Sequence, residues 1–159
     1  MIQMSINASS PAFYPLLAGL LAGGITLILS IIRILPPLTT RRIKITQYYK
    51  TQAENYFYEQ VKKKIPFKNI LFTKPMEDYW SRRSELGKIV TNSILYFFLS
   101  GFMLILGDIL MLINACFHIL DDDFMLKIIL ACIVCCMLFL FMAIIYFKAI
   151  YKEEAKIRA

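Results

Sequence analysis

Apolar residues dominate three long runs of the chain, at residues 12–35, 89–120 and 124–151. Each run is long enough to cross the hydrocarbon core of a bilayer, because a transmembrane helix needs about 20 predominantly apolar residues. Only an aspartate triplet, residues 121–123, separates the second run from the third. So short a connection predicts that these two helices are antiparallel neighbours. The pattern therefore predicts three transmembrane helices.

The polar segment between the first and second runs, residues 38–88, has a helical period of its own. Pro36 and Pro37 precede it and are expected to end the first helix, because proline cannot donate a backbone hydrogen bond. A second helix is expected to start at Thr73 or Lys74 and to continue into the second apolar run. The part of this segment before the second helix is itself expected to be helical. Its apolar residues recur every four positions and form a stripe on one face. The stripe comprises Ile45, Tyr49, Ala53, Phe57, Val61 and Ile65.

Composition supports a membrane protein. The hydrophobic fraction is 58% and the mean hydropathy is +0.60, whereas a soluble domain has about 45–50% apolar residues. The predicted fold class is therefore all-α, an integral membrane protein with three transmembrane helices. A basic helical cytoplasmic hairpin is expected between the first and second of them.

The distribution of basic residues predicts the orientation of the chain. Residues 38–88 contain twelve Lys and Arg against five Asp and Glu, and the C-terminal segment 152–159 adds more basic residues. Residues 1–11 contain no charge, so they are expected to form a short external N-terminus without a cleaved secretory signal. The positive-inside rule then places the hairpin and the C-terminus on the cytoplasmic side of a bacterial inner membrane.

One face of the second apolar run collects small and polar side chains. They recur at seven-residue spacing, and a transmembrane aspartate costs about 2.5–3.5 kcal/mol on insertion scales. Such a face is expected to lie against protein, in an oligomer or helix bundle, or to line a pore. We predict that Asp108→Asn preserves assembly and that Asp108→Leu weakens it. The residues of this polar face are Ser93, Ser100, Gly101, Gly107, Asp108 and Asn114.

The first apolar run has a face of small residues that includes a GxxxG motif. Small side chains let helix backbones approach closely, either within one subunit or between copies. The first helix is expected to pack on the other two through this face. The predicted helix-packing residues are Ala18, Gly19, Ala22 and Gly23.

The hairpin combines basic and aromatic side chains. Lys and Arg clusters attract the anionic inner leaflet, and interleaved aromatics favour a soluble cytoplasmic protein as a second partner. Nucleic acid is disfavoured, because no recognisable binding module is present. The predicted partner- or lipid-binding residues are Arg41, Arg42, Lys44, Tyr49, Phe57, Lys62, Lys63, Lys64, Trp80, Arg82 and Arg83.

Catalytic motifs are absent from the sequence: it contains no HExxH, GxSxG, P-loop or dinucleotide fingerprint. The one histidine, His118, lies beside the aspartate triplet, where a pH-sensing cluster is an alternative to an interfacial hydrogen bond. Cys132, Cys135 and Cys136 are interpreted as packing residues, with a metal site as the alternative. No catalytic residue, metal or cofactor is expected.

These features predict a non-enzymatic, oligomeric membrane subunit that anchors or regulates a soluble cytoplasmic partner. Richness in Ile, Lys, Phe and Tyr is typical of AT-rich genes, which suits the membrane sensor or effector of a bacterial phage-defence system. Two alternatives remain open: a small channel or pore-forming effector lined by the second helix, and an accessory subunit of a large membrane complex.

Overall fold

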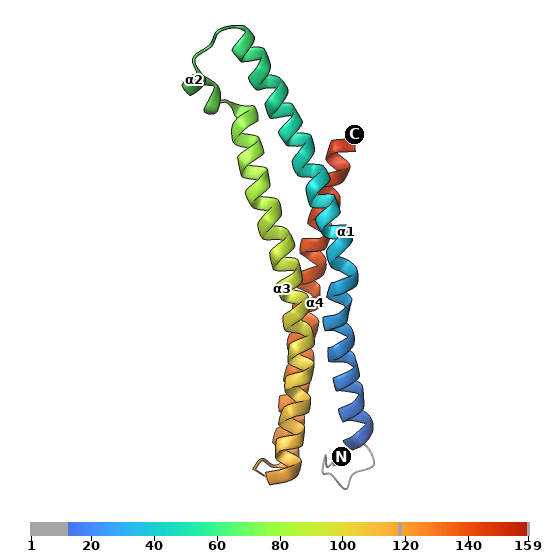
Figure 1. Cartoon of the computed structure of the whole chain (residues 1–159). Coiled ribbons are helices and arrows are strands. Elements are labelled where there is room, and N and C mark those ends of the chain that lie inside the picture. Colours follow the sequence, from blue (N-terminus) through green and yellow to red (C-terminus); the bar gives the residue numbers. More distant parts are fainter. Residues whose placement is uncertain (1–12, 118, 159) are drawn as a thin grey trace. The chain divides into compact units, whose positions relative to one another are not determined.

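The computed structural model describes residues 13–117 and 119–158. Within these residues the chain is helical and has no strand (Figure 1). The helices are α1 (Phe13–Lys62), α2 (Phe67–Leu71), α3 (Lys74–Phe117) and α4 (Asp122–Arg158). The predicted external N-terminus and His118, for which a pH-sensing cluster is one interpretation, lie outside the described residues.

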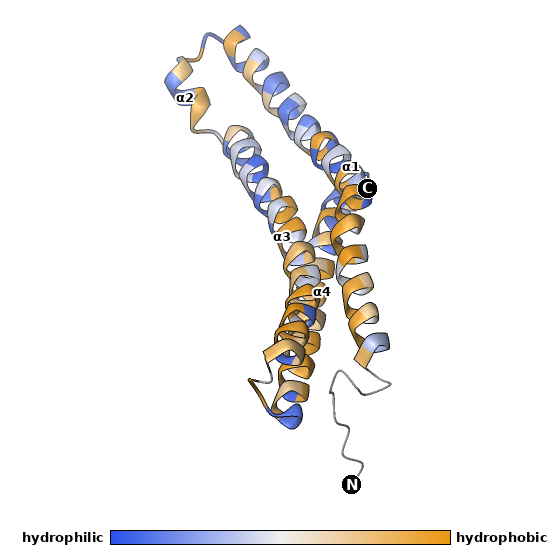
Figure 2. Ribbon diagram, turned by 60° about the horizontal axis from the view of Figure 1, so that its bottom comes forward, coloured by the Kyte–Doolittle hydropathy of each residue, from blue (hydrophilic) through white to orange (hydrophobic). Residues whose placement is uncertain are grey.

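Three helices, α1, α3 and α4, are long and apolar enough to cross a membrane. Figure 2 shows hydrophobic residues concentrated in α4, in the N-terminal part of α1 and in the C-terminal part of α3. The rest of α1 and α3 mixes hydrophobic and hydrophilic residues. The all-α class and the three candidate spans are therefore confirmed.

The chain divides into two compact units. The apolar unit contains the described residues 13–33 and 94–144, and the hairpin unit contains residues 34–93 and 145–158. The core of the apolar unit joins its three helices. It is formed by Phe13 and Leu20 of α1, Met111 of α3, and Met125 and Ile129 of α4.

In the hairpin unit, α1 and α3 run antiparallel and are joined through α2 (Figure 1). Leucine and isoleucine side chains form its core, each contributing about 1.5–3 kcal/mol when fully buried. The buried hydrophobic residues are Leu38, Ile45, Ala53, Ile70, Leu86, Val90 and Ile150. Ile45 and Ala53 belong to the predicted stripe, whose last members, Val61 and Ile65, are exposed.

The prediction that Pro36 and Pro37 end the first helix is wrong, because α1 continues through both prolines to Lys62. Two nearby threonines form additional hydrogen bonds at this point. The Thr39 hydroxyl lies 2.9 Å from the Leu35 and Pro36 carbonyl oxygens, and the Thr40 hydroxyl donates to Pro36 at 2.9 Å. The complete burial of Leu38 in the next turn also holds the helical path.

The second boundary prediction is correct. A helix begins at Lys74 and continues without interruption into the second apolar run. The carbonyl of Thr73 accepts hydrogen bonds from the backbone N–H groups of Met76 and Glu77, both at 3.0 Å. The short helix α2 lies between α1 and α3.

Candidate functional site

The predicted polar face of α3 is buried inside the chain. Gly101 and Gly107 are buried in the apolar unit with Asp108 and Asn114, which are 3% and 7% exposed. Ser100 in the apolar unit and Ser93 in the hairpin unit are completely buried. The helices of a single chain therefore already cover this face, and its burial does not require a second copy.

The polar side chains of this face differ in their hydrogen bonding. The Ser100 hydroxyl donates to the Phe97 carbonyl at 2.7 Å. Asn114 Oδ1 accepts from the backbone N–H of Leu120 at 2.8 Å, so Asn114 stabilises the chain segment that follows α3. Among the described residues, neither carboxyl oxygen of Asp108 has a hydrogen-bond partner. The burial of Asn114 is therefore explained by its hydrogen bond, whereas the burial of Asp108 has no such explanation.

In the apolar unit, the backbones of α1 and α3 approach each other closely at Gly24 and Gly101. A Cβ added to Gly24 would lie 2.7 Å from Ile105 Cγ1 and 2.9 Å from the Gly101 carbonyl oxygen. A Cβ added to Gly101 would lie 2.8 Å from the Gly24 carbonyl oxygen. Only glycine at both positions permits this approach of the two backbones.

The small-residue face predicted for the first helix does not make this contact. Ala18, Gly19 and Ala22 are exposed, and an added Cβ on Gly19 would meet nothing within 4 Å. Gly23 is half-buried, and its added Cβ would lie 3.3 Å from a Leu104 methyl carbon. The expected packing within the chain is therefore wrong for the first three residues, because the adjacent position, Gly24, faces α3. A contact between copies stays a prediction.

In the hairpin unit, Arg41 of α1 is paired with Glu154 of α4. Glu154 also accepts a hydrogen bond from Arg158 at 2.6 Å, and the Arg41 guanidinium lies 3.8 Å from the centre of the Tyr151 ring. Burial acts to raise the pKa of Glu154, but the two arginines outweigh it and hold this pKa below its usual value. The result is a charged clamp between α1 and α4.

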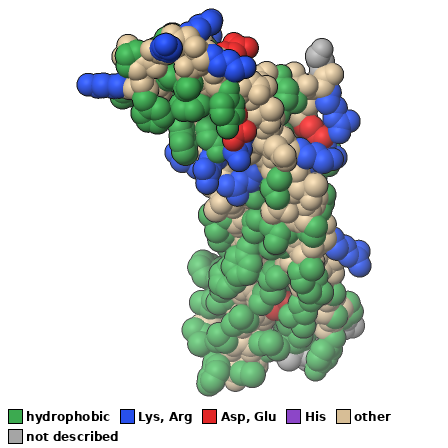
Figure 3. Space-filling view, turned by 45° about the horizontal axis from the view of Figure 1, so that its top comes forward, with side chains coloured by type: hydrophobic (Ala, Val, Ile, Leu, Met, Phe, Trp, Pro, Cys, Tyr) green, Lys and Arg blue, Asp and Glu red, His purple; other side chains and the backbone are tan. Residues whose placement is uncertain are grey.

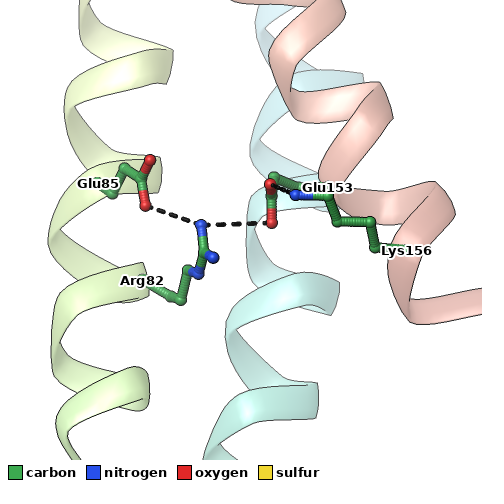
Figure 4. Close-up of polar contacts among 4 residues, drawn as sticks. All are labelled: Arg82, Glu85, Glu153 and Lys156. Carbon is green, nitrogen blue, oxygen red and sulfur yellow. Dashed lines mark hydrogen bonds and ion pairs between the residues drawn. The ribbon is translucent and has the colours of Figure 1, made fainter.

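Arg82 of α3 makes the second contact to α4 in this unit (Figure 4). Its Nη1 atom lies 3.0 Å from Glu85 Oε2 and 3.5 Å from Glu153 Oε2. Glu153 also accepts a hydrogen bond from Lys156 at 2.6 Å. Two adjacent acidic residues of α4 thus bind one arginine each from α1 and α3.

The other predicted partner- or lipid-binding residues lie at different positions in the hairpin unit. Tyr49 and Phe57 are half-buried, whereas Trp80 and Arg83 are exposed. Arg42 is half-buried, and its Nη2 atom lies 3.3 Å from where a Cβ on Gly87 would be. The remaining members, all exposed lysines, are Lys44, Lys62, Lys63 and Lys64.

Sequence reasoning missed the role of the acidic pair Glu153–Glu154. The signal was present, since these two residues are the only acids in the basic C-terminal segment 152–159. Two acids at neighbouring positions of a helix can face two different helices. Each of those helices offers a pair of arginines, at residues 41–42 and at residues 82–83.

Among the described residues, no three His, Cys, Asp or Glu side chains are grouped as metal ligands. Comparison of the chain with protein-family models, with curated protein sequences and with solved structures gives no match of any of the three kinds.

Proposed function

We propose that this chain is a non-enzymatic multi-pass membrane subunit whose cytoplasmic hairpin binds and regulates a soluble protein partner. One observation carries the proposal. The helices that contain the apolar runs continue into a hairpin whose far end exposes large aromatic side chains. Figure 3 shows hydrophobic side chains exposed among the Lys and Arg side chains.

The exposed aromatics gather around α2. Phe72 is 73% exposed, Tyr58 64%, Phe67 59% and Trp80 58%. A hollow of about 350 Å³ beside them is lined by Phe57, Phe67, Tyr79 and other side chains of the hairpin unit. Aromatic side chains beside basic ones are typical of protein-binding surfaces. This surface supports docking of a protein, and continuous helices offer a route by which docking affects the spans.

The proposal includes assembly into a homo-oligomer. The exposed series Ala18, Gly19 and Ala22 supports it, because small residues on an uncovered helix face allow a second helix to approach. The membrane sensor or effector of a phage-defence system remains the biological setting that we favour, on composition alone.

Site-specific photo-crosslinking in native membranes tests partner binding. A benzoylphenylalanine in place of Phe72 is expected to give one discrete adduct with a soluble protein, lost when Phe67 is changed to Ser. The matched control is the same substitution at Phe102, which is 44% exposed in the apolar unit and is expected to give no such adduct. Absence of the adduct at Phe72, or an equal adduct at Phe102, would contradict the proposal.

A channel is the second candidate, and Asp108 is the observation that favours it. A buried carboxyl without a partner is the kind of group found along ion and proton paths. The polar face is covered in the single chain, so conduction would require the helices to rearrange. Ion flux into liposomes that is abolished by Asp108→Asn would support a channel, whereas no flux from the unaltered protein would exclude it.

A further inference from the structure

Tandem arginines occur once on each helix of the hairpin, as Arg41–Arg42 on α1 and Arg82–Arg83 on α3. The first member of each pair binds an acidic residue of α4. Adjacent residues on a helix point about 100° apart, so the second members face elsewhere. Within the described part of the chain, neither Arg42 nor Arg83 forms an ion pair with a carboxylate.

Arg42 and Arg83 both line two adjoining hollows between α1 and α3. The hollows have volumes of about 510 and 530 Å³. The first extends along α1 and the second along α3. Their other charged lining residues are Lys50, Glu54 and Lys88. Glu54 lies 3.5 Å from Lys50, so the hollows keep an excess of positive charge.

The second hollow contains further groups suited to an oxyanion. Its lining includes hydroxyl and amide side chains and the Trp80 ring, and the absence of a side chain at Gly87 leaves room for the Arg42 guanidinium. The Arg83 guanidinium lies 5.8 Å from the centre of the Trp80 ring, and its Nη1 atom lies 3.5 Å from the Tyr79 hydroxyl. The hydroxyl and amide residues are Ser84, Thr91 and Asn92.

The position along the chain favours a ligand at the membrane surface. Lys88, Thr91 and Asn92 stand where the second apolar run begins, and Thr39 of the first hollow stands just after the first apolar run. In a membrane-inserted chain these residues lie at headgroup depth. Guanidinium groups bind phosphate oxygens in pairs of parallel hydrogen bonds.

We infer that Arg42, Arg83 and Lys88 form a binding site for a phosphate group, carried either by an anionic phospholipid headgroup or by a soluble organic phosphate. This inference goes beyond partner docking: the two surfaces share Trp80, but Arg42, Arg83 and Lys88 do not line the hollow beside the exposed aromatics. A failure to find a protein partner would leave it unaffected.

Intrinsic fluorescence provides a direct test, because Trp80 is the only tryptophan of the chain. The purified full-length protein in dodecyl maltoside micelles is titrated with phosphatidic acid, phosphatidylcholine or glycerol 3-phosphate. A saturable change with phosphatidic acid, a much weaker one with glycerol 3-phosphate and none with phosphatidylcholine would assign the site to a lipid. Equal affinity for glycerol 3-phosphate would support a phosphate site for a soluble ligand.

Three variants test the residues. The double variant Arg42→Gln/Arg83→Gln is expected to lose about tenfold in affinity for each arginine removed, since hydrogen bonds to charged groups are the strong ones. Lys62→Gln/Lys63→Gln removes the same charge from exposed residues at the end of α1 and is expected to bind normally. Gly87→Val keeps all charges but fills the space beside Arg42, and it is expected to weaken binding.

Unchanged thermal unfolding of each variant serves as the check that it folds. The inference is overturned if no phosphate compound changes the fluorescence, or if the arginine and lysine double variants lose affinity equally. Normal binding by a folded Gly87→Val variant would likewise overturn the assigned geometry.

Discussion

Lys64, two residues after the end of α1, adopts the left-handed conformation, with φ at 58°. Its N–H donates to the Val61 carbonyl at 2.9 Å, and the N–H of Ile65 donates to the Gln60 carbonyl at 3.2 Å. This is the Schellman arrangement, which usually has glycine where Lys64 stands. A residue with a Cβ costs about 1–2 kcal/mol in this conformation.

We therefore expect Lys64→Gly to raise the free energy of unfolding by about 1 kcal/mol. Unfolding by SDS in mixed micelles, followed by circular dichroism, measures the change. Lys63→Gly is the control, because Lys63 has no positive φ and glycine there should lower stability. A stability loss in both variants would contradict the assigned helix end.

Asp108 and Asn114 are both buried polar residues, but their replacement is expected to change stability in opposite directions. Removing an unpartnered buried carboxyl relieves a desolvation penalty, so Asp108→Ala is expected to raise the free energy of unfolding by roughly 1–3 kcal/mol. Asn114→Ala breaks the bond to Leu120 and is expected to lower it by about 1 kcal/mol. The same unfolding assay compares the two. A loss of stability in Asp108→Ala would mean that the carboxyl has a partner that a single chain does not supply.

At the scale of the helices, the contact between α1 and α3 depends on two glycines. Gly24→Ala places a methyl group within 3 Å of the Gly101 backbone and the Ile105 side chain. We expect it to lower the free energy of unfolding of the protein by about 1–3 kcal/mol, since the helices must separate. Gly19→Ala is the matched control for packing within one chain, where the added methyl group meets open space. In monomeric protein it should be neutral or stabilising, because alanine favours helix by up to about 1 kcal/mol over glycine.

Much of the helical architecture could be predicted from the sequence. Apolar runs of membrane length and the absence of a breaker between Met76 and Gly87 predict three long helices and the start of α3. The path of α1 through Pro36 and Pro37 could not be predicted, because it depends on the burial of Leu38 and on hydroxyl groups in the next turn.

The candidate sites divide in the same way. Seven-residue spacing locates the polar face of α3, since a single helix determines it. Whether another helix covers that face depends on α1 and α4. The choice of Gly24 over Gly19 likewise depends on the rotation of α1 about its axis. In each tandem pair, the first arginine binds α4 and the second does not. This difference depends on the positions of Glu153 and Glu154 in the folded chain, which the sequence alone does not give.

The charged clamp of the hairpin unit predicts a dependence on pH. The pKa of Glu154 is lowered in the folded chain, so the folded state binds fewer protons than the unfolded state. Its stabilising effect is complete above the ordinary glutamate pKa of 4.5 and is lost as the pH falls below that value. The Glu154→Gln protein is expected to be less stable than the unaltered protein at pH 7. It should also lose less stability as the pH falls, because it lacks the carboxyl group that is protonated. Melting curves between pH 3 and pH 7 test this, and identical acid transitions in both proteins would contradict it.

At the scale of the whole molecule, the arrangement of charge determines the expected orientation. The net charge is +7, and most of the basic residues lie in the hairpin rather than at the connection between α3 and α4. That connection carries the aspartate triplet, with Lys127 as the nearest base, 2.8 Å from Asp123. Because basic segments are retained on the cytoplasmic side, the hairpin is expected inside and the aspartates outside.

Cysteine labelling in intact cells measures this orientation. The four native cysteines, Cys116, Cys132, Cys135 and Cys136, are first replaced by Ser. Single cysteines are then introduced by Lys63→Cys in the hairpin and Asp123→Cys at the aspartate triplet, both at exposed positions. A membrane-impermeant maleimide is expected to label the Asp123→Cys protein in intact cells and the Lys63→Cys protein only after the cells are opened. The reverse pattern would place Arg42, Arg83 and the exposed aromatics outside the cell, and a cytoplasmic partner could then no longer reach them.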